Sequence, residues 1–291
     1  NMSGDSKKNL VVRITEAAVI SSAAQEVLTL ARSRDASLVE IGNAISKEPS
    51  LAAELLRIAN SPFFGRSGRI KTLPDALMLI GLNEIYNMAS AMAMMAAFSD
   101  DDDLLEEFRL KALIAATIAR IISKKTKTID QSTAFTAGLL CYIGSAGCIS
   151  IDGETYKEIL AEAKKSDNYG AEVERLEVER YGMTSRQIGG EMLIRNRLPE
   201  ELVNAVSAGD DAFNSDADEL QRLVQFSRMA ASNILECSNI SEIHDIKVDY
   251  VEMIKTAFGE DADIEQYFDI VIDAFHSGQK YIDGTLKVFN S

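Results

Sequence analysis

The side chains best suited to catalysis are scarce in this sequence. Of its 291 residues only two are histidines, His244 and His276, and both lie in the last fifth of the chain. The three cysteines, Cys141, Cys148 and Cys237, are odd in number and form no C-x-x-C pair, so neither a disulfide framework nor a cysteine zinc site is predicted. We interpret the cysteines as reduced thiols and the histidines as ordinary surface or core residues.

Other motifs for catalysis or ligand binding are equally weak. Cys141 as a nucleophile would need a base, and no histidine lies in its part of the sequence. Gly138, Gly144 and Gly147 lack the Gly-Lys-Ser/Thr ending of a phosphate loop, so we expect them to allow close helix approach instead. The acidic run Asp100–Asp103 lacks the ligand spacing of a calcium loop. We interpret this run as a junction and the acidic start of the next helix.

Composition and charge restrict the class of protein. With only 4 prolines and 17 glycines, the chain has too few turn residues for an all-β fold, and we predict an all-α fold. The 45 acidic residues outnumber 30 lysines and arginines, and a net charge of −15 argues against a nucleic-acid partner. No apolar run approaches about 18 to 20 residues and no signal peptide is visible, so we expect a cytoplasmic protein with no membrane partner.

Helical periodicity dominates residues 14 to 98, where apolar residues recur at three- and four-residue steps. Pro49 suits the first turn of a helix, Thr72 opens a capping box, and Gly81 is expected to end that helix. Asn83 is then expected to cap the helix that follows. This next helix carries no charge over residues 88–97, which predicts a buried core helix. A methionine-rich partner surface is the alternative.

The periodicity divides the chain into three parts: an N-terminal helical subdomain over residues 14–99, a second helical subdomain over 100–214, and a C-terminal helical extension over 215–291. Thr184 opens a capping box in the second part, and Asp218 caps the first helix of the extension together with Ser215. Three helices are expected at the start of the second part, over residues 104–123, 132–149 and 154–165.

One stretch of the first part goes beyond generic helical pattern. Residues 50–65 have the sequence SLAAELLRIANSPFFG, preceded by IGNAISKEP and followed further on by LPDALMLIGLNEIYNMASAMAM. These motifs resemble the HDOD family, the HD-related output domain of bacterial signalling proteins, which carries an Ala-Asn-Ser turn and an Ala-x-x-Leu-Leu-Gly-Leu helix. The resemblance covers about residues 14 to 210. One departure lies near residues 18–22, where the family has Leu-Pro pairs and this chain has none.

The Ala-Asn-Ser turn has a physical explanation of its own. Asparagine tolerates left-handed backbone geometry and its amide bonds nearby backbone, so Asn60 is expected to end the helix while Pro62 prevents its continuation. Phe63 and Phe64 would then fill the core.

The alternative is a binding loop around Asn60, Phe63 and Phe64. In that case Arg66 and Arg69, with Lys71, would supply positive charge for an anionic ligand.

The second half resembles the HD superfamily of metal-dependent phosphohydrolases through residues 137–144, AGLLCYIG. In those enzymes the fifth and sixth positions are a metal-ligating His-Asp pair, and here they are Cys141 and Tyr142. The other ligand positions fall at or near Leu110, Ser185, Gly209 and Asp210. None of these residues is a histidine, and hydrolytic metal sites need imidazole and carboxylate ligands in number. The resemblance therefore implies no bound metal, no cofactor and no phosphohydrolase activity.

Together these features predict a non-enzymatic signalling module that binds protein partners or a nucleotide-like second messenger. The alternative is a sensor in which the metal-free pocket holds a small anion, with residues such as Lys111 or Arg186 in place of the metal. The two differ in whether the pocket around Leu110, Cys141 and Ser185 is open and basic or filled by side chains.

Overall fold

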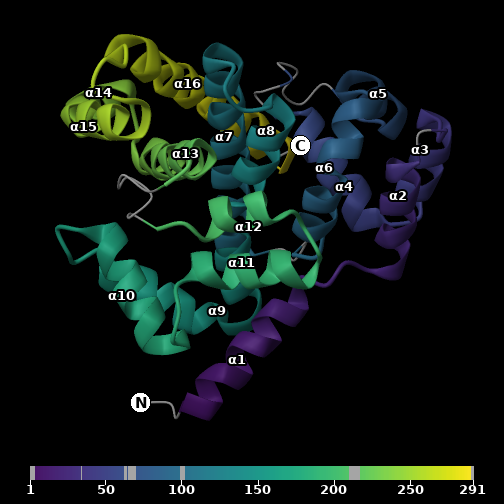
Figure 1. Cartoon of the computed structure of the whole chain (residues 1–291), viewed down its shortest axis with the longest axis horizontal. Coiled ribbons are helices and arrows are strands. Elements are labelled where there is room, and N and C mark those ends of the chain that lie inside the picture. The colour runs from purple at the N-terminus through teal and green to yellow at the C-terminus, as the bar shows by residue number, and fades with distance from the viewer. Residues whose placement is uncertain are drawn as a thin grey trace.

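Helices make up all the regular secondary structure in the part of the chain that the structure describes (Figure 1). The structure is a computed structural model. It describes residues 4–33, 35–61, 64, 70–98, 102–209 and 217–289, of which residues 23, 32 and 280–289 are described by their backbone only. The predicted all-α fold class is confirmed.

The first group of helices packs around α6. Helices α2, α4 and α5 contact α6, and α3 packs against α2, α4 and α5. The methionine-rich stretch of α6 is buried, including Met88, Met92 and Met94, so the core interpretation is confirmed and the partner-surface alternative is wrong. The bounds are α2 Ser22–Arg32, α3 Leu38–Ser46, α4 Pro49–Ala59, α5 Leu73–Ile80 and α6 Leu82–Ala96.

Local start and stop signals explain the bounds of these helices. Pro49 occupies the first turn of α4, as predicted. Thr72 Oγ1 accepts a hydrogen bond from the Asp75 N–H at the start of α5. Gly81 ends that helix with φ 84°, a conformation that glycine adopts without strain. The predicted cap at Asn83 is wrong, because α6 begins at Leu82 directly after Gly81.

Two helices, α7 (Asp103–Thr126) and α8 (Gln131–Leu140), form the centre of the molecule (Figure 1). Asp102 caps α7 through its carboxylate, which accepts from two backbone N–H groups, so the described part of the acidic run does start a helix. Helices α7 and α8 lie so close together that a Cβ on Gly138 would stand 2.6 Å from the Ala116 Cα atom. Helix α6 packs on α8, which joins the first group to this centre.

The helix predicted over residues 132–149 is wrong as a single element. It breaks at Cys141 and Tyr142, and the chain resumes as α9 (Ile143–Ala163). Gly144 permits contact between α9 and α11, since a Cβ there would lie 1.8 Å from the Ser185 carbonyl oxygen. Helix α9 kinks at Asp152, whose carboxylate accepts from Arg180 Nε and Nη2 at 2.9 and 3.1 Å.

The span from Gln131 to Ala163 is long and apolar enough to cross a membrane by length and composition. The chain turns between α8 and α9 within this span, and 89% of its most apolar window is buried inside the protein. These two helices are therefore part of the buried core.

Helix α1 (Gly4–Ala17) belongs spatially to the second half of the chain. It packs against α9, α10 (Tyr169–Tyr181) and α11 (Ser185–Arg195), at the opposite end of the molecule from α5 (Figure 1). The turn after α1 is fixed by Asn196, which donates to the Ala18 carbonyl at 3.1 Å and accepts from the Ile20 N–H at 3.4 Å. This turn is the place where the chain departs from the Leu-Pro pattern.

The remaining helices close the fold around the central pair. Helix α13 packs on α7, α8 and α12, and α16 packs on α7, so the C-terminal helices share the core with the preceding ones. Thr184 and Asp218 form the predicted capping boxes, while Ser215 lies outside the described residues. The bounds are α12 Glu200–Ser207, α13 Glu219–Glu236, α14 Ile240–Asp245, α15 Lys247–Phe258 and α16 Ile264–Phe289.

Candidate functional site

A cleft of about 240 Å³ lies among α7, α9, α10, α11 and α13, and we call it the inner cleft. Residue Tyr142, one of the two positions that the resemblance assigns to the His-Asp pair, forms part of its wall. The charged side chains of the lining are Lys111, Arg186, Arg228, Glu174, Glu177 and Glu236. Aromatic rings also line it, from Phe108, Tyr142, Tyr156 and Tyr169.

Tyr142 and Arg228 contact each other in the wall of the cleft. The Tyr142 hydroxyl donates to the Arg228 carbonyl oxygen at 2.7 Å, and burial raises the pKa of this hydroxyl well above its ordinary value. The Arg228 guanidinium carbon lies 5.0 Å from the centre of the Tyr142 ring, a cation–π distance. No carboxylate of the described residues lies within 4.0 Å of this guanidinium, and its Nε is buried with no hydrogen-bond partner among them.

The other two cations of the cleft have carboxylate partners. Lys111 Nζ lies 2.8 Å from a Glu107 carboxylate oxygen and 4.9 Å from the centre of the Phe108 ring. Arg186 Nη2 lies 2.5 Å from a Glu174 carboxylate oxygen. The Lys111 and Arg186 side chains are only 5% and 4% exposed, so both charges are held in low-dielectric surroundings.

Glu177 is a buried carboxylate, and each of its two oxygens accepts a hydrogen bond from within the protein. It accepts from the Tyr156 hydroxyl at 2.7 Å and from the Ser185 N–H at 2.7 Å. The second bond places the carboxylate at the N-terminus of α11, where the helix dipole stabilises negative charge. Ser145 Oγ donates to Ser185 Oγ at 3.2 Å beside this network. The network therefore joins α9, α10 and α11 at this wall of the cleft.

Leu110, Cys141 and Ser185, around which a pocket was expected, do not line the inner cleft, although Tyr142 and Ser145 beside them do. On α7 the neighbouring Lys111 faces the cleft, because each helical residue turns its side chain by about 100° from the last. Ser185 is 2% exposed and lies behind the cleft, beside Ser145, which does line it.

Cys141 is buried among apolar residues and is turned away from the cleft lining. Burial raises the pKa of its thiol to about 12, so at neutral pH it carries its proton. Gly209 does not line the cleft either, and Asp210 lies outside the described residues. Lys111 and Arg186, the basic residues expected of an anion pocket, both line the cleft.

The residue that sequence analysis missed is Arg228. Sequence analysis places α13 in a C-terminal extension and assigns no residue of it to the site. One face of this helix carries Gln225, Arg228 and Ser232 at steps of three and four residues, and all of them line the cleft. This polar stripe on a largely buried helix was the signal that could have found the site.

The second candidate, the segment after α4, is anchored by Asn60. The Asn60 amide nitrogen donates to the carbonyl oxygens of Leu56 at 3.0 Å and Ile70 at 2.8 Å, and its oxygen accepts from the Ile70 N–H at 3.0 Å. Asn60 has φ −89°, so it ends the helix without the left-handed geometry that was expected.

Only part of that segment is described. Phe64 is half-buried against the hydrophobic core, consistent with a filling role. Phe63, Arg66 and Arg69 lie outside the described residues. Lys71 is exposed. The role of Arg66, Arg69 and Lys71 in binding an anion stays a prediction.

These motifs and this helical arrangement agree with one family. The sequence pattern of the HDOD domain matches residues 18–212, about two thirds of the chain. The chain belongs to the HDOD family. No protein with a curated description matches this HDOD chain.

Solved structures share the fold at low sequence identity. A protein from Shewanella amazonensis SB2B, named provisionally as a phosphohydrolase, has a TM-score of 0.66 at 19% identity and covers 94% of this HDOD chain and 97% of its own. An HDOD domain protein of unknown function from Geobacter sulfurreducens has a TM-score of 0.60 at 15% identity, covering 93% and 98%. A protein from Marinobacter aquaeolei VT8, named provisionally as a signal transduction protein, has a TM-score of 0.54 at 18% identity, covering 90% and 59%.

Proposed function

We propose that this HDOD protein is a cytoplasmic, non-catalytic signalling module that acts by binding protein partners or a signalling ligand. Family membership supports a regulatory role, and so does the name of the similar Marinobacter aquaeolei protein. The inner cleft supports the non-catalytic part. Its former His-Asp positions hold a buried thiol turned away and a phenol bonded to a backbone carbonyl, and this pair does not offer the ligands of a hydrolytic metal site.

A specific observation favours ligand binding at the inner cleft. Arg228 places a guanidinium against Tyr142, one of the two residues that stand where HD enzymes have their metal-ligating His-Asp pair. Lys111 and Arg186 are engaged by Glu107 and Glu174, whereas Arg228 has no carboxylate partner among the described residues. A phosphate or carboxylate oxygen would supply that missing partner, and guanidinium is the cation best suited to it.

The other contents of the cleft restrict the ligand. Glu177 and Glu236 also line the walls, so a highly charged anion would meet repulsion as well as attraction. The rings of Phe108 and Tyr169 offer apolar and stacking surface. We infer that the ligand is a compact, nucleotide-like molecule with a single anionic group directed at Arg228.

The binding proposal is tested with guanosine monophosphate as the probe. Wild-type protein should melt at higher temperature with guanosine monophosphate, because a ligand that binds only the folded state stabilises it. Arg228→Met keeps the aliphatic stem and removes the charge, and it should abolish this shift. Arg175→Met removes an exposed arginine of α10 outside the cleft and should leave the shift intact. No shift in wild type, or equal shifts in both variants, would contradict ligand binding at the cleft.

The non-catalytic part has a separate test. Hydrolysis of p-nitrophenyl phosphate and of cyclic dinucleotides is measured with added Mn²⁺, and no turnover is expected. A turnover that disappears in Tyr142→Phe would show that the cleft is catalytic after all.

A further inference from the structure

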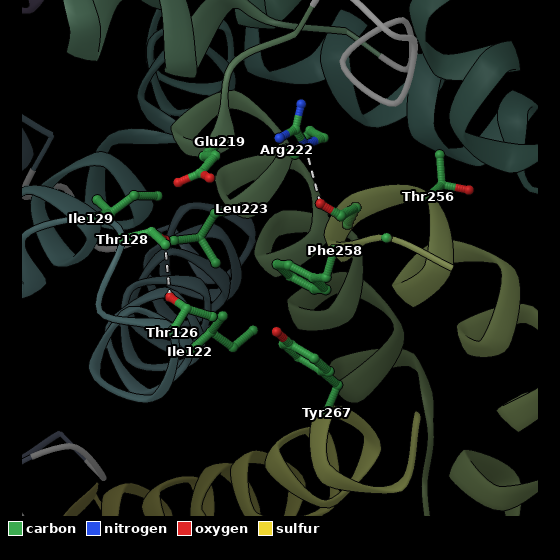
Figure 2. Close-up of a pocket in the computed structure, with 12 residues that line it drawn as sticks. Ile122, Thr126, Thr128, Ile129, Glu219, Arg222, Leu223, Thr256, Phe258 and Tyr267 are labelled. Atoms are coloured by element: carbon green, nitrogen blue, oxygen red, sulfur yellow. Dashed lines mark hydrogen bonds between the residues drawn. The ribbon is translucent and has the colours of Figure 1, made fainter. Parts of the chain in front are cut away.

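A second cavity, of about 370 Å³, lies beside the first turns of α13, whereas the inner cleft is lined by residues 225–236 of that helix. It is shown in Figure 2, and we call it the outer cavity. Its residues come from four separate segments: the end of α7, the turn after it, the first turn of α13, and the α15–α16 connection with Tyr267. This volume falls within the range of about 300 to 1,000 Å³ that is usual for ligand pockets. The outer cavity shares no lining residue with the inner cleft.

The walls of the outer cavity are apolar. Ile122 and Leu223 are buried, and Figure 2 shows both directed toward the space that Phe258 and Tyr267 also border. The Phe258 and Tyr267 rings are stacked, with centroids 4.2 Å apart and planes 5° apart, which fixes one wall as a rigid aromatic surface.

The rim of the outer cavity is polar. Thr128 Oγ1 donates to Thr126 Oγ1 at 3.2 Å on one side. On the other side Arg222 Nε donates to the Ala257 carbonyl oxygen at 3.1 Å, and the same guanidinium also donates to the Ala217 carbonyl oxygen. These bonds hold a positive charge at the rim, and Figure 2 shows the bond to the Ala257 carbonyl. The carboxylate of Glu219, one helical turn before Arg222, also lines the cavity.

The charge around this rim differs from that of the whole chain. The net charge is −15, yet the end of α7 carries Lys124, Lys125 and Lys127 on either side of the lining residue Thr126. All three lysines are exposed, and none forms an ion pair within the described ranges. Together with Arg222 they place four positive charges near a cavity that Glu219 also lines, in an otherwise acidic protein.

We propose that the outer cavity binds a small amphipathic carboxylate. Its acyl or aryl body packs between Ile122, Leu223 and the stacked rings, and its carboxylate lies at the rim, where Arg222 and the threonine hydroxyls can bond it. The lysines at the end of α7 raise the local concentration of the anion. This site is independent of the function proposed for the inner cleft.

The probe is 8-anilinonaphthalene-1-sulfonate, an aryl anion whose fluorescence rises in apolar surroundings, titrated into the folded full chain. One saturable site is expected. Decanoate should displace the dye, and decanol, which has the same chain length and no charge, should displace it at least about tenfold less well, because a charged hydrogen bond is lost. Equal displacement by both compounds would overturn the assignment of an anion.

Two variants place the site. Thr128 is an exposed lining residue, so Thr128→Trp should fill the cavity from its edge without straining the core, and should weaken dye binding at least about tenfold. Thr256→Trp, at the opposite exposed edge, is the second filling variant if the first does not fold. Arg175→Met, which removes an exposed arginine outside both cavities, should leave dye binding unchanged. Unchanged binding in the filling variant, or loss in Arg175→Met, would overturn the proposed location.

Two double lysine variants, one near the outer cavity and one distant from it, test the role of charge. Lys124→Gln with Lys125→Gln should weaken dye binding about threefold at low salt, with the difference vanishing as salt screens the charges. Lys164→Gln with Lys165→Gln removes the same charge from the end of α9, where both lysines are also exposed, and should have no effect. Equal effects of the two doublets would show non-specific attraction and would overturn the proposal that the rim is a recognition element.

Discussion

The side-chain amide of Asn60 bonds both backbone polar groups of Ile70, accepting from its N–H at 3.0 Å and donating to its carbonyl at 2.8 Å. The same amide nitrogen donates to the Leu56 carbonyl at 3.0 Å, at the end of α4. One asparagine thus ends a helix and pairs with a residue ten positions later. The most specific part of the family motif is therefore explained by backbone hydrogen bonding.

Asn60→Ala should lower the free energy of unfolding by about 1 to 3 kcal/mol, because it strands the Ile70 backbone groups away from a partner. Urea unfolding measures the change. Asn43→Ala, on the exposed face of α3, is the control and should change stability by less than about 0.5 kcal/mol. An Asn60→Ala curve that overlays wild type would remove the structural explanation of the motif.

Gly144→Ala should destabilise the fold by about 1 to 3 kcal/mol or more, because the new Cβ would lie 1.8 Å from the Ser185 carbonyl and α9 and α11 would have to separate. Gly153→Ala in the same helix meets no atom within 4 Å, so it should be neutral or stabilising by up to about 1 kcal/mol. Thermal melts of the two variants should therefore move in opposite directions or differ by several degrees.

Glu177→Gln should lower the free energy of unfolding by about 1 to 3 kcal/mol, although glutamine has nearly the same shape as glutamate. Both partners of this carboxylate, the Tyr156 hydroxyl and the Ser185 N–H, are donors, and a glutamine would turn its own NH₂ group toward one of them. Glu179→Gln removes an exposed carboxylate from the same helix and should cost less than about 1 kcal/mol. Similar losses in the two variants would mean that the buried network contributes little.

The pH dependence of stability should reveal the buried thiol. Burial raises the pKa of Cys141 from 9.0 to about 12, so above pH 9.0 the unfolded chain loses a proton that the folded protein retains. The contribution of this group is therefore complete below pH 9.0 and is lost as the pH rises toward about 12. Unfolding free energy measured from pH 8 to 11 should fall less steeply in Cys141→Ala than in wild type, and equal slopes would contradict a buried thiol.

Sequence patterns predicted the helices well where a local signal sets their ends. Thr72, Gly81 and Thr184 act within a few residues of themselves, so capping chemistry identified them. The break at Cys141 and Tyr142 was missed because its cause is not local. Tyr142 turns toward a carbonyl 86 positions later, on α13, and no periodicity within residues 132–149 reports that contact.

In the candidate site, too, the sequence predicted what depends on local residues and missed what depends on contacts between distant helices. The types of residue at the former metal positions were available from the resemblance, and Lys111 and Arg186 were identified as cations of the pocket. Which of two adjacent residues faces the pocket depends on the rotation of α7, and this is set by packing against α8 and α13. Arg228 could be assigned to the cleft only from the packing of α13 on α7 and α8. The spacing of residues in the sequence therefore could not predict its contact with Tyr142.

The position of α1 has a consequence for the order of assembly. Its buried residues Leu10 and Ile14 pack toward α9 and α11, and Lys7 donates to the Glu179 carbonyl oxygen, 172 positions away. During synthesis this helix leaves the ribosome long before its partners exist, so its apolar face stays open to water or to chaperones until α11 has been made. Docking of α1 therefore closes a long loop of chain, and contacts between residues so far apart in sequence are of the kind that form slowly.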